Sequence, residues 1–313
     1  MSRPRRPDAL PLRDGVSASC AVVHGGPWAS VLDFLCERLP VLPRAQWAAR
    51  LAAGDVLNAD GTPVDAQRTP TEGQRVFYYR QLDAEPDAPE DAQVLYQDEG
   101  LVVADKPHFM PVTPSGQFIQ RSLLVRLKRA LALPDLSPVH RIDRETAGLV
   151  VFAIKPNTRD AYQALFRDRR VDKLYEAVAP DLPTLTAPLT HTSRLERDPD
   201  RFFLSREVPG APNSCSHIER AAALAGGNAL YHLRPVTGQR HQLRLHMQAL
   251  GAPIVGDAFY PTVLRGPGEP DDPAQPLQLL ARELAFDDPV TGQRRLFRSR
   301  RQLQRARPAE ALA

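Results

Sequence analysis

Short apolar runs follow one another through the chain after residue 94, and they constrain its fold more than any other feature. Four of these runs are apolar or β-branched and have the length of strands, at 101–104, 148–154, 174–178 and 230–236. Apolar residues at helical spacing separate them at 158–168 and 240–250. Strands with occasional helices predict an α+β fold with a mixed, mainly antiparallel central sheet and flanking helices. Residues 183–217 show neither pattern, and we predict a loop-rich insertion there.

An earlier part of the chain has the pattern of a small separate unit. Apolar residues recur at helical spacing from Ser30 to Leu39, and Pro40 ends this helix. Three further elements are predicted: a helix over 44–53, a hairpin over 56–64 that turns at Asp60 and Gly61, and a strand over 75–80. This order of elements predicts a helix–helix–hairpin module.

Composition changes mark four segments along the chain. We predict a basic, flexible N-terminus at 1–27, the module at 28–80, an acidic and Pro-rich linker at 81–93, and a large domain at 94–313. The first segment is rich in Pro and Arg and has no periodicity, and the linker has no apolar periodicity.

Charge is segregated along the 313 residues, although the formal net charge is only +3. Arginines cluster at 3–6, 167–170 and 294–307, whereas acidic residues cluster at 83–91. Segregated charge can give a basic face that suits a nucleic acid, but each run alone is more typical of a solvated surface.

Other features favour a cytoplasmic protein. The sequence has no apolar run of about eighteen residues, so we expect no membrane span. Its three cysteines are far apart and in no metal-ligand spacing, so we expect neither a disulfide framework nor a metal site. No exposed apolar helix face is evident, and we expect a monomer.

The densest group of charged and titratable residues lies in 138–148, directly before a predicted strand. Asp143 stands between Arg141 and Arg144, close to His140. Neighbouring positive charge favours the ionised carboxylate, which can act as a nucleophile or base. A surface cluster of ion pairs explains the residues alone equally well.

A second candidate segment covers 235–247. On a helix, Leu243 and Met247 would anchor one face, and Arg244 on the adjacent face could point to a site. His241 and His246 are five residues apart, which is not the spacing of a helical zinc pair. Tyr175, on the predicted strand at 174–178, is by itself most typical of packing.

These segments together resemble the RluA family of pseudouridine synthases. The stretch His140–Gly148 is similar to the family's catalytic motif, 173–175 to its second motif, and 237–244 with 256–257 to its third. Two further stretches, 94–107 and 279–292, also fit, in the family's order. The module at 28–80 resembles the alpha-L RNA-binding module, which a ribosomal small-subunit protein also contains; a small structural cap is the alternative.

The resemblance implies a pseudouridine synthase type of central sheet and an RNA pseudouridine synthase activity that needs no cofactor or metal. It implies that Asp143 attacks the sugar C1′ or the base C6, or assists base departure. Arg244 would pair with Asp143, and Tyr175 would stack on the uracil and could take its C5 proton. Implied substrate-binding residues are His140, Arg141, Arg144, Thr146, Gly238, Arg240, His241 and Gln242, and implied RNA contacts of the module are Arg44, Trp47 and Arg50.

The expected partner is a structured RNA, ribosomal or transfer RNA. Its target uridine would leave its stack, and Arg141 would fill the vacated space or hold the neighbouring phosphate. Two other functions use the same residues. A non-catalytic RNA-binding or ribosome-assembly protein would use the basic faces without needing Asp143. A hydrolase would pair Asp143 with His140, but the sequence has no plausible triad order or oxyanion motif.

Overall fold

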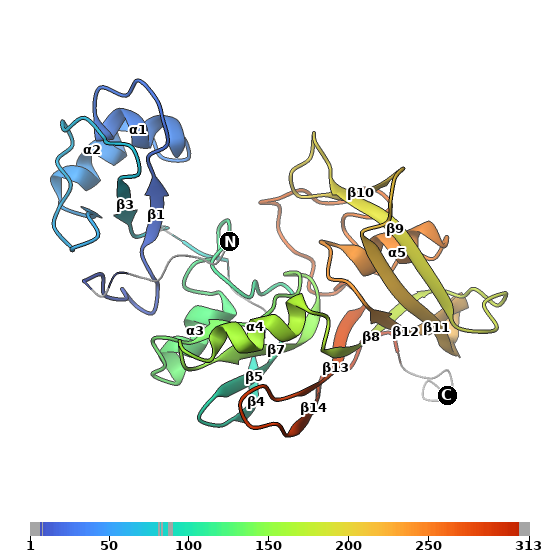
Figure 1. Cartoon of the computed structure of the whole chain (residues 1–313). Coiled ribbons are helices and arrows are strands. Elements are labelled where there is room, and N and C mark those ends of the chain that lie inside the picture. The colour runs from blue at the N-terminus through green and yellow to red at the C-terminus, as the bar shows by residue number, and fades with distance from the viewer. Residues whose placement is uncertain (1–6, 8, 81, 83, 87–89, 307–313) are drawn as a thin grey trace. The chain divides into compact units, whose positions relative to one another are not determined.

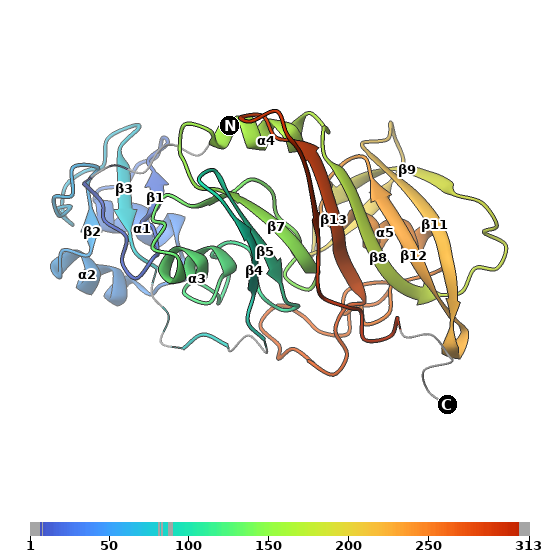
Figure 2. The same cartoon turned by 90° about the horizontal axis from the view of Figure 1, so that it is seen from below.

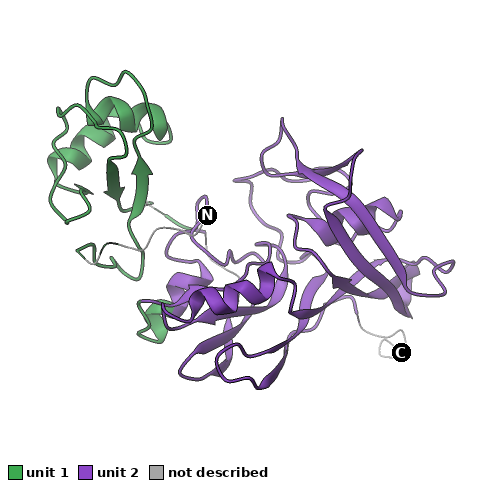
Figure 3. Ribbon diagram, in the orientation of Figure 1, with its two compact units in different colours: residues 1–85, 128–134 green, residues 86–127, 135–313 purple. Residues whose placement is uncertain are grey.

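The computed structural model describes residues 7, 9–80, 82, 84–86 and 90–306. The chain divides into two compact units, residues 1–85 with 128–134 and residues 86–127 with 135–313 (Figure 3). Four arginines of the predicted basic clusters lie outside the described residues, namely Arg3, Arg5, Arg6 and Arg307, as does part of the predicted linker.

The first unit is a three-stranded sheet with two helices. Its strands lie in the order β1 (Ser19–Val22), β3 (Arg75–Tyr78) and β2 (Val56–Leu57) (Figure 2). Its helices are α1 (Val31–Arg38) and α2 (Arg44–Ala52) (Figure 1). Ser30 caps α1 by accepting a hydrogen bond from the Asp33 N–H at 3.2 Å. Both predicted helices, the hairpin turn and the β3 strand are therefore confirmed.

Two predictions for this unit are wrong. Residues 19–22 were expected to be flexible, but they form β1, because Ala21 and neighbouring Val23 pack into the core of the unit. Trp47 was expected to contact RNA, but only 1% of it is exposed, and its Nε1 donates to the Leu39 carbonyl at 3.3 Å. A side chain this buried stabilises the helix pair and cannot stack on a base in this structure.

The second unit contains a large, mainly antiparallel sheet. Its strands are β4 (Gln93–Gln97), β5 (Leu101–Lys106), β6 (Ser137–Pro138), β7 (Ala147–Ala153), β8 (Asp172–Pro180), β9 (Leu189–Arg197), β10 (Ser205–Val208), β11 (Ser214–Leu224), β12 (Asn228–Pro235), β13 (Leu279–Asp287) and β14 (Arg294–Arg298). Their main path runs β10-β9-β11-β12-β8-β13-β7-β5-β4, and most of it is visible side by side in Figure 2. Within the described residues, β7 and β13 form its parallel pair. The predicted fold class is confirmed.

The parallel contact between β7 and β13 joins the two halves of this sheet, and Gly148 makes it possible. Gly148 pairs with Ala281, and a Cβ on Gly148 would lie 2.3 Å from the Ala281 carbonyl oxygen. Its φ of +112° is also a conformation that side chains disfavour. Glycine at this position therefore lets β7 lie against β13 directly after the Asp143 segment.

A helix packs against each half of the sheet. Helix α4 (Arg159–Arg167) packs Tyr162 and Leu165 on the β5 and β7 half, and α5 (Gln242–Ala249) packs Leu243 and Met247 on the β8, β11 and β12 half. Both helices were predicted, whereas α3 (Leu123–Ala130) and the 3-10 turn at Ala225–Gly227 were not.

The prediction of a loop-rich insertion at 183–217 is wrong. These residues contribute β9, β10 and the first part of β11. β10 is the edge strand of the main path and β9 is its neighbour, and much of the surface of both lies in water. They therefore lack the apolar alternation by which a strand is predicted. No helix within the described residues is long and apolar enough to cross a membrane.

Candidate active site

A cleft of about 1270 Å³ opens in the second unit where the β7 and β8 halves of the sheet meet α5. It is larger than the about 300–1,000 Å³ of typical small-molecule pockets, so it has room for more than a single small ligand. All of the predicted catalytic and substrate-binding residues line it: His140, Arg141, Asp143, Arg144, Thr146, Tyr175, Gly238, Arg240, His241, Gln242 and Arg244. The structure thus brings together three segments that are distant in sequence.

The Asp143 segment crosses from β6 to β7 and is held by its main chain. The turn is closed by the Thr146 N–H, which donates to the Asp143 carbonyl at 3.2 Å. The buried Lys106 donates from Nζ to the Arg144 carbonyl at 3.1 Å, and His108 Nδ1 donates to the Glu145 carbonyl at 2.6 Å. Burial lowers the pKa of Lys106 to about 7 and of His108 to about 4, so His108 is neutral at pH 7. These contacts position the partly exposed Asp143 carboxylate in the cleft.

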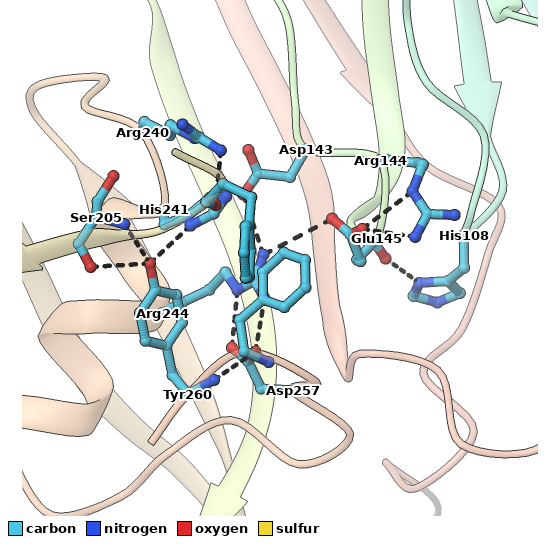
Figure 4. A network of polar contacts seen from close by, with 12 residues as sticks. His108, Asp143, Arg144, Glu145, Ser205, Arg240, His241, Arg244, Asp257 and Tyr260 are labelled. Carbon is cyan, nitrogen blue, oxygen red and sulfur yellow. Dashed lines mark hydrogen bonds and ion pairs between the residues drawn. The ribbon is translucent and has the colours of Figure 1, made fainter. Parts of the chain in front are cut away.

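The Arg244 guanidinium is the central charged group of the site (Figure 4). Its side chain is 1% exposed, and it forms a bidentate ion pair with Asp257 through Nε at 2.8 Å and Nη2 at 2.6 Å. Its Nη1 lies 3.7 Å from carboxylate oxygens of both Asp143 and Glu145. Burial opposes the charge, but the nearby carboxylates keep the pKa of Arg244 above its ordinary value. Arg244 therefore stays charged and attracts Asp143 without a direct hydrogen bond.

Two aromatic rings and a histidine support Arg244. Its guanidinium carbon lies 4.8 Å from the centre of the Phe259 ring and 5.3 Å from that of Tyr260. The Tyr260 hydroxyl lies 2.8 Å from His241 Nδ1 and donates to the Ser205 carbonyl at 3.0 Å. Burial, followed by the positive charge of Arg244, lowers the pKa of His241 to about 3, so His241 is neutral. These groups fix the orientation of the guanidinium before any ligand binds.

Tyr175 reaches the same cleft from β8. Burial and the negative charge of Asp143 both raise its pKa above the ordinary value of tyrosine. Its phenol is therefore protonated at neutral pH, and its partly buried ring forms an apolar wall beside Asp143.

Several predicted substrate-binding side chains have protein partners of their own. His140 stacks on Phe166 with ring centres 4.3 Å apart, and its Nε2 accepts from the Val151 N–H at 3.1 Å. Burial lowers the pKa of His140 to about 3, so it is neutral. The buried Gln242 donates to the Cys215 carbonyl at 2.9 Å and accepts from Thr237. These two side chains shape the wall, and their contact with a substrate stays a prediction.

The other predicted binding residues differ in their protein partners and in their exposure. Arg144 forms a bidentate ion pair with Asp271 at 2.6 and 2.8 Å, and Arg240 donates to the carbonyl oxygens of Phe202 and Phe203. Two further predicted residues are Thr146, which is 2% exposed, and Gly238, which is exposed. In the first unit, Arg44 is ion-paired with Asp33 and Arg50 donates to the Tyr79 carbonyl.

Positive charge gathers on the wall of the cleft. We define its basic rim as five cleft-lining residues, namely Arg141, Arg167, Arg169, Lys173 and Arg197. Four of them are exposed, whereas burial, with a smaller effect of Arg169, lowers the pKa of Lys173 to about 8. Besides Asp143 and Glu145, the cleft lining contains one more acidic residue, Glu269. The rim can bind phosphate groups at neutral pH.

Sequence reasoning gave no role to Glu145, Asp257, Phe259 or Tyr260. Asp257 lay within a stretch that resembled the family, but a loop residue carries no periodicity that would direct it at Arg244. Glu145 could have been noticed as an acidic residue beside Asp143.

One group of described residues has the composition of a metal site, although none of its members lines the cleft. Ligand atoms of His191, Glu207 and His246 lie within 4.8 Å of one another. The buried His246 already contacts serine hydroxyls through both ring nitrogens, Ser216 at 3.0 Å and Ser214 at 2.9 Å. These hydrogen bonds satisfy both ring nitrogens of the buried His246.

Residues 100–249 match the sequence profile of a family described as RNA pseudouridylate synthase. The chain is 31% identical over 214 residues to the dual-specificity RNA pseudouridine synthase RluA of Haemophilus influenzae, covering 66% of this chain and 92% of that protein. It is 30% identical over 275 residues to ribosomal large subunit pseudouridine synthase D of Xanthomonas campestris, covering 83% and 81%.

The fold has solved counterparts as well. The structure of human RNA pseudouridylate synthase domain containing 1 superposes with a TM-score of 0.55 at 22% identity, covering 70% of this chain and 86% of that chain. This likeness concerns the fold and agrees with the mainly antiparallel sheet described above.

Proposed function

Because the chain belongs to the RluA family of RNA pseudouridine synthases, an isomerase family that acts on RNA, we propose that Asp143 is its catalytic carboxylate. The observation that carries this proposal is the placement of Asp143 beside a buried, charged arginine in a large cleft with a basic rim. The catalytic function is supported over the non-catalytic RNA-binding alternative, since the relatives are named as synthases.

The reaction breaks the bond between uracil N1 and ribose C1′, turns the base, and joins its C5 to C1′. The C5 proton leaves and N1 gains a proton, so the isomerisation is redox-neutral and takes no outside atom. In our proposal the Asp143 carboxylate attacks C1′ or C6, or stabilises the departing base. Each of these routes needs an ionised carboxylate at the nucleotide.

Arg244 is proposed to orient Asp143. Its fixed charge lies 3.7 Å from the Asp143 oxygen and is held there by Asp257. A preorganised charge of this kind costs little reorganisation during the reaction.

Tyr175 is proposed to stack on the flipped uracil. Its raised pKa disfavours the phenolate, so stacking is better supported than removal of the C5 proton by this side chain. Arg141, exposed at the cleft, is proposed to fill the space that the uridine leaves or to hold the adjacent phosphate.

The substrate is proposed to be ribosomal or transfer RNA, and the enzyme to act as a cytoplasmic monomer. One relative is named for the large ribosomal subunit, which supports ribosomal RNA, and the three free cysteines agree with a cytoplasmic location. The first unit is proposed to add RNA affinity through exposed residues such as Arg44.

The proposal is tested by Asp143→Asn, with tritium release from uridine labelled at C5 as the measure of turnover. We expect turnover to fall at least about a thousandfold, because an amide is neither a nucleophile nor a base. RNA affinity should stay within about tenfold of wild type.

Glu99→Gln is the matched control, since the Glu99 side chain is 93% exposed and lies outside the cleft lining. It should turn over at the wild-type rate. An Asp143→Asn variant that still makes pseudouridine at a normal rate would remove Asp143 from the reaction.

A further inference from the structure

An exposed phenylalanine lies on the wall of the cleft. Phe202 belongs to the loop between β9 and β10, is 74% exposed, and lines the same cleft as Asp143. A ring left so largely in water contributes little to the stability of the fold. Large apolar side chains exposed at a binding cleft are typical of surfaces that meet a ligand.

The loop around Phe202 is held in place by hydrogen bonds. The Asp198 carboxylate accepts from the N–H groups of Asp200 at 3.0 Å and Arg201 at 2.8 Å. The Leu204 N–H donates to the Arg201 carbonyl at 2.8 Å, which closes a turn around the phenylalanine. The loop is therefore built before RNA binds, and little ordering is needed on binding.

A second set of contacts ties this loop to the active site. The Arg240 guanidinium donates to the carbonyl oxygens of Phe202 at 2.7 Å and Phe203 at 2.6 Å. The Phe203 ring packs against Phe259 at 5.4 Å, and Phe259 lies against the Arg244 guanidinium. Phe203 therefore anchors the loop beside the catalytic groups, while its neighbour Phe202 stays exposed.

The surroundings of Phe202 favour RNA as its partner. Unpaired RNA bases stack on aromatic rings, and the basic rim of the cleft can bind the phosphates on either side of such a base. A uridine that leaves its stack also separates its neighbours, which then need a new surface. The cleft volume of about 1270 Å³ leaves room for a nucleotide besides the target.

We propose that the Phe202 ring is a stacking platform for an unpaired base next to the target uridine, and that Arg240 positions it. This inference rests on the proposed function and deepens it, because it assigns a second nucleotide site in the same cleft. Arg240 then acts through the loop and not through direct contact with the uridine.

Three variants at one position separate stacking from simple apolar contact. The substrate is RNA from cells that lack this enzyme, labelled with tritium at uridine C5, and filter binding of the same RNA is measured in parallel. For Phe202→Ala we expect the concentration that gives half of the maximal single-turnover rate to rise about tenfold, because the stacking of one base is lost. The rate at saturation should stay within about twofold, since no reacting atom is touched.

Phe202→Trp should restore the wild-type concentration dependence, whereas Phe202→Leu should behave as Phe202→Ala. Val290→Ala is the matched control, because Val290 is 55% exposed and lies outside the cleft lining. Unchanged RNA binding in Phe202→Ala, or full rescue by leucine, would overturn the stacking platform. An exposed ring that serves a protein partner would give the first of these results.

The two proposals fail in different ways. If the wild-type enzyme binds the RNA but releases no tritium, the isomerase assignment to this cleft fails. Weaker binding by Phe202→Ala in filter assays would then still support the platform. If tritium release is normal in both wild type and Phe202→Ala across all concentrations, only the platform fails.

Discussion

At the scale of single residues, the site depends on how one buried guanidinium is held. The helical spacing around 240–250 predicted that Arg244 points to a site, and the structure places it 3.7 Å from Asp143. Its strongest partner, Asp257, was not predicted, because loop residues meet a helix only through the tertiary fold. Roles that depend on such a meeting cannot be derived from spacing along the chain.

Asp257→Asn should expose the dependence of the site on this ion pair. The change leaves the Arg244 charge buried with a weaker partner, and we expect the free energy of unfolding to fall by about 3–5 kcal/mol. Turnover should fall as well, because Arg244 would no longer be fixed beside Asp143. Urea denaturation and tritium release measure the two effects.

Asp181→Asn is the matched control, since Asp181 forms the same bidentate pair with Arg220, at 2.6 and 2.9 Å, on a more exposed surface. Its effect on stability should be much smaller. Equal losses of unfolding free energy in the two variants would mean that burial does not increase the contribution of the Arg244–Asp257 pair to stability.

At the scale of elements, the sequence predicted the helices and strands that have a clear apolar pattern. The helices α1, α2, α4 and α5 were found because apolar residues recur in them at helical spacing. The strand β7 was found as a continuous apolar run, and it is buried along its whole length. The strands β9 and β10 were missed, since their side chains are mostly polar and much of the two strands is exposed. Helix α3 carries a usable signal in Leu123 and Leu127, four residues apart.

Gly148→Ala should disrupt the parallel pairing of β7 with β13. The added Cβ would lie 2.3 Å from the Ala281 carbonyl oxygen, and neither backbone can move without disturbing its strand. We expect a loss of at least about 2 kcal/mol in the free energy of unfolding. Turnover should also fall, because the Asp143 segment leads directly into β7.

Gly292→Ala separates backbone strain from this steric conflict. Gly292 has a φ of +72°, but nothing lies within 4 Å of its would-be Cβ. Strain alone should cost about 1 kcal/mol there. If Gly148→Ala proves no more damaging than Gly292→Ala in thermal unfolding, the close approach of the two strands is not essential.

At the scale of the whole molecule, the first unit has its own core and is proposed to serve RNA affinity. Deleting residues 1–80 should raise the dissociation constant for RNA more than about fivefold, because a linked second contact is lost. The single-turnover rate on saturating RNA should stay within about twofold, since every cleft-lining residue belongs to the second unit.

The salt dependence of binding gives a second measure of the same deletion. Loss of phosphate contacts should reduce the slope of log affinity against log salt concentration. A truncated enzyme with unchanged affinity and slope would indicate that this unit is a structural cap. The alpha-L resemblance would then describe its shape and not its role.

The pairing of β7 with β13 has a consequence for how the enzyme is made. β5 and β7 come well before β13 along the chain, so they leave the ribosome before it during translation. Contacts between segments so far apart can form only after both are available. A nascent chain that has not yet exposed β13 therefore lacks the strand that pairs with the start of β7, and we expect it to be catalytically inactive until β13 emerges.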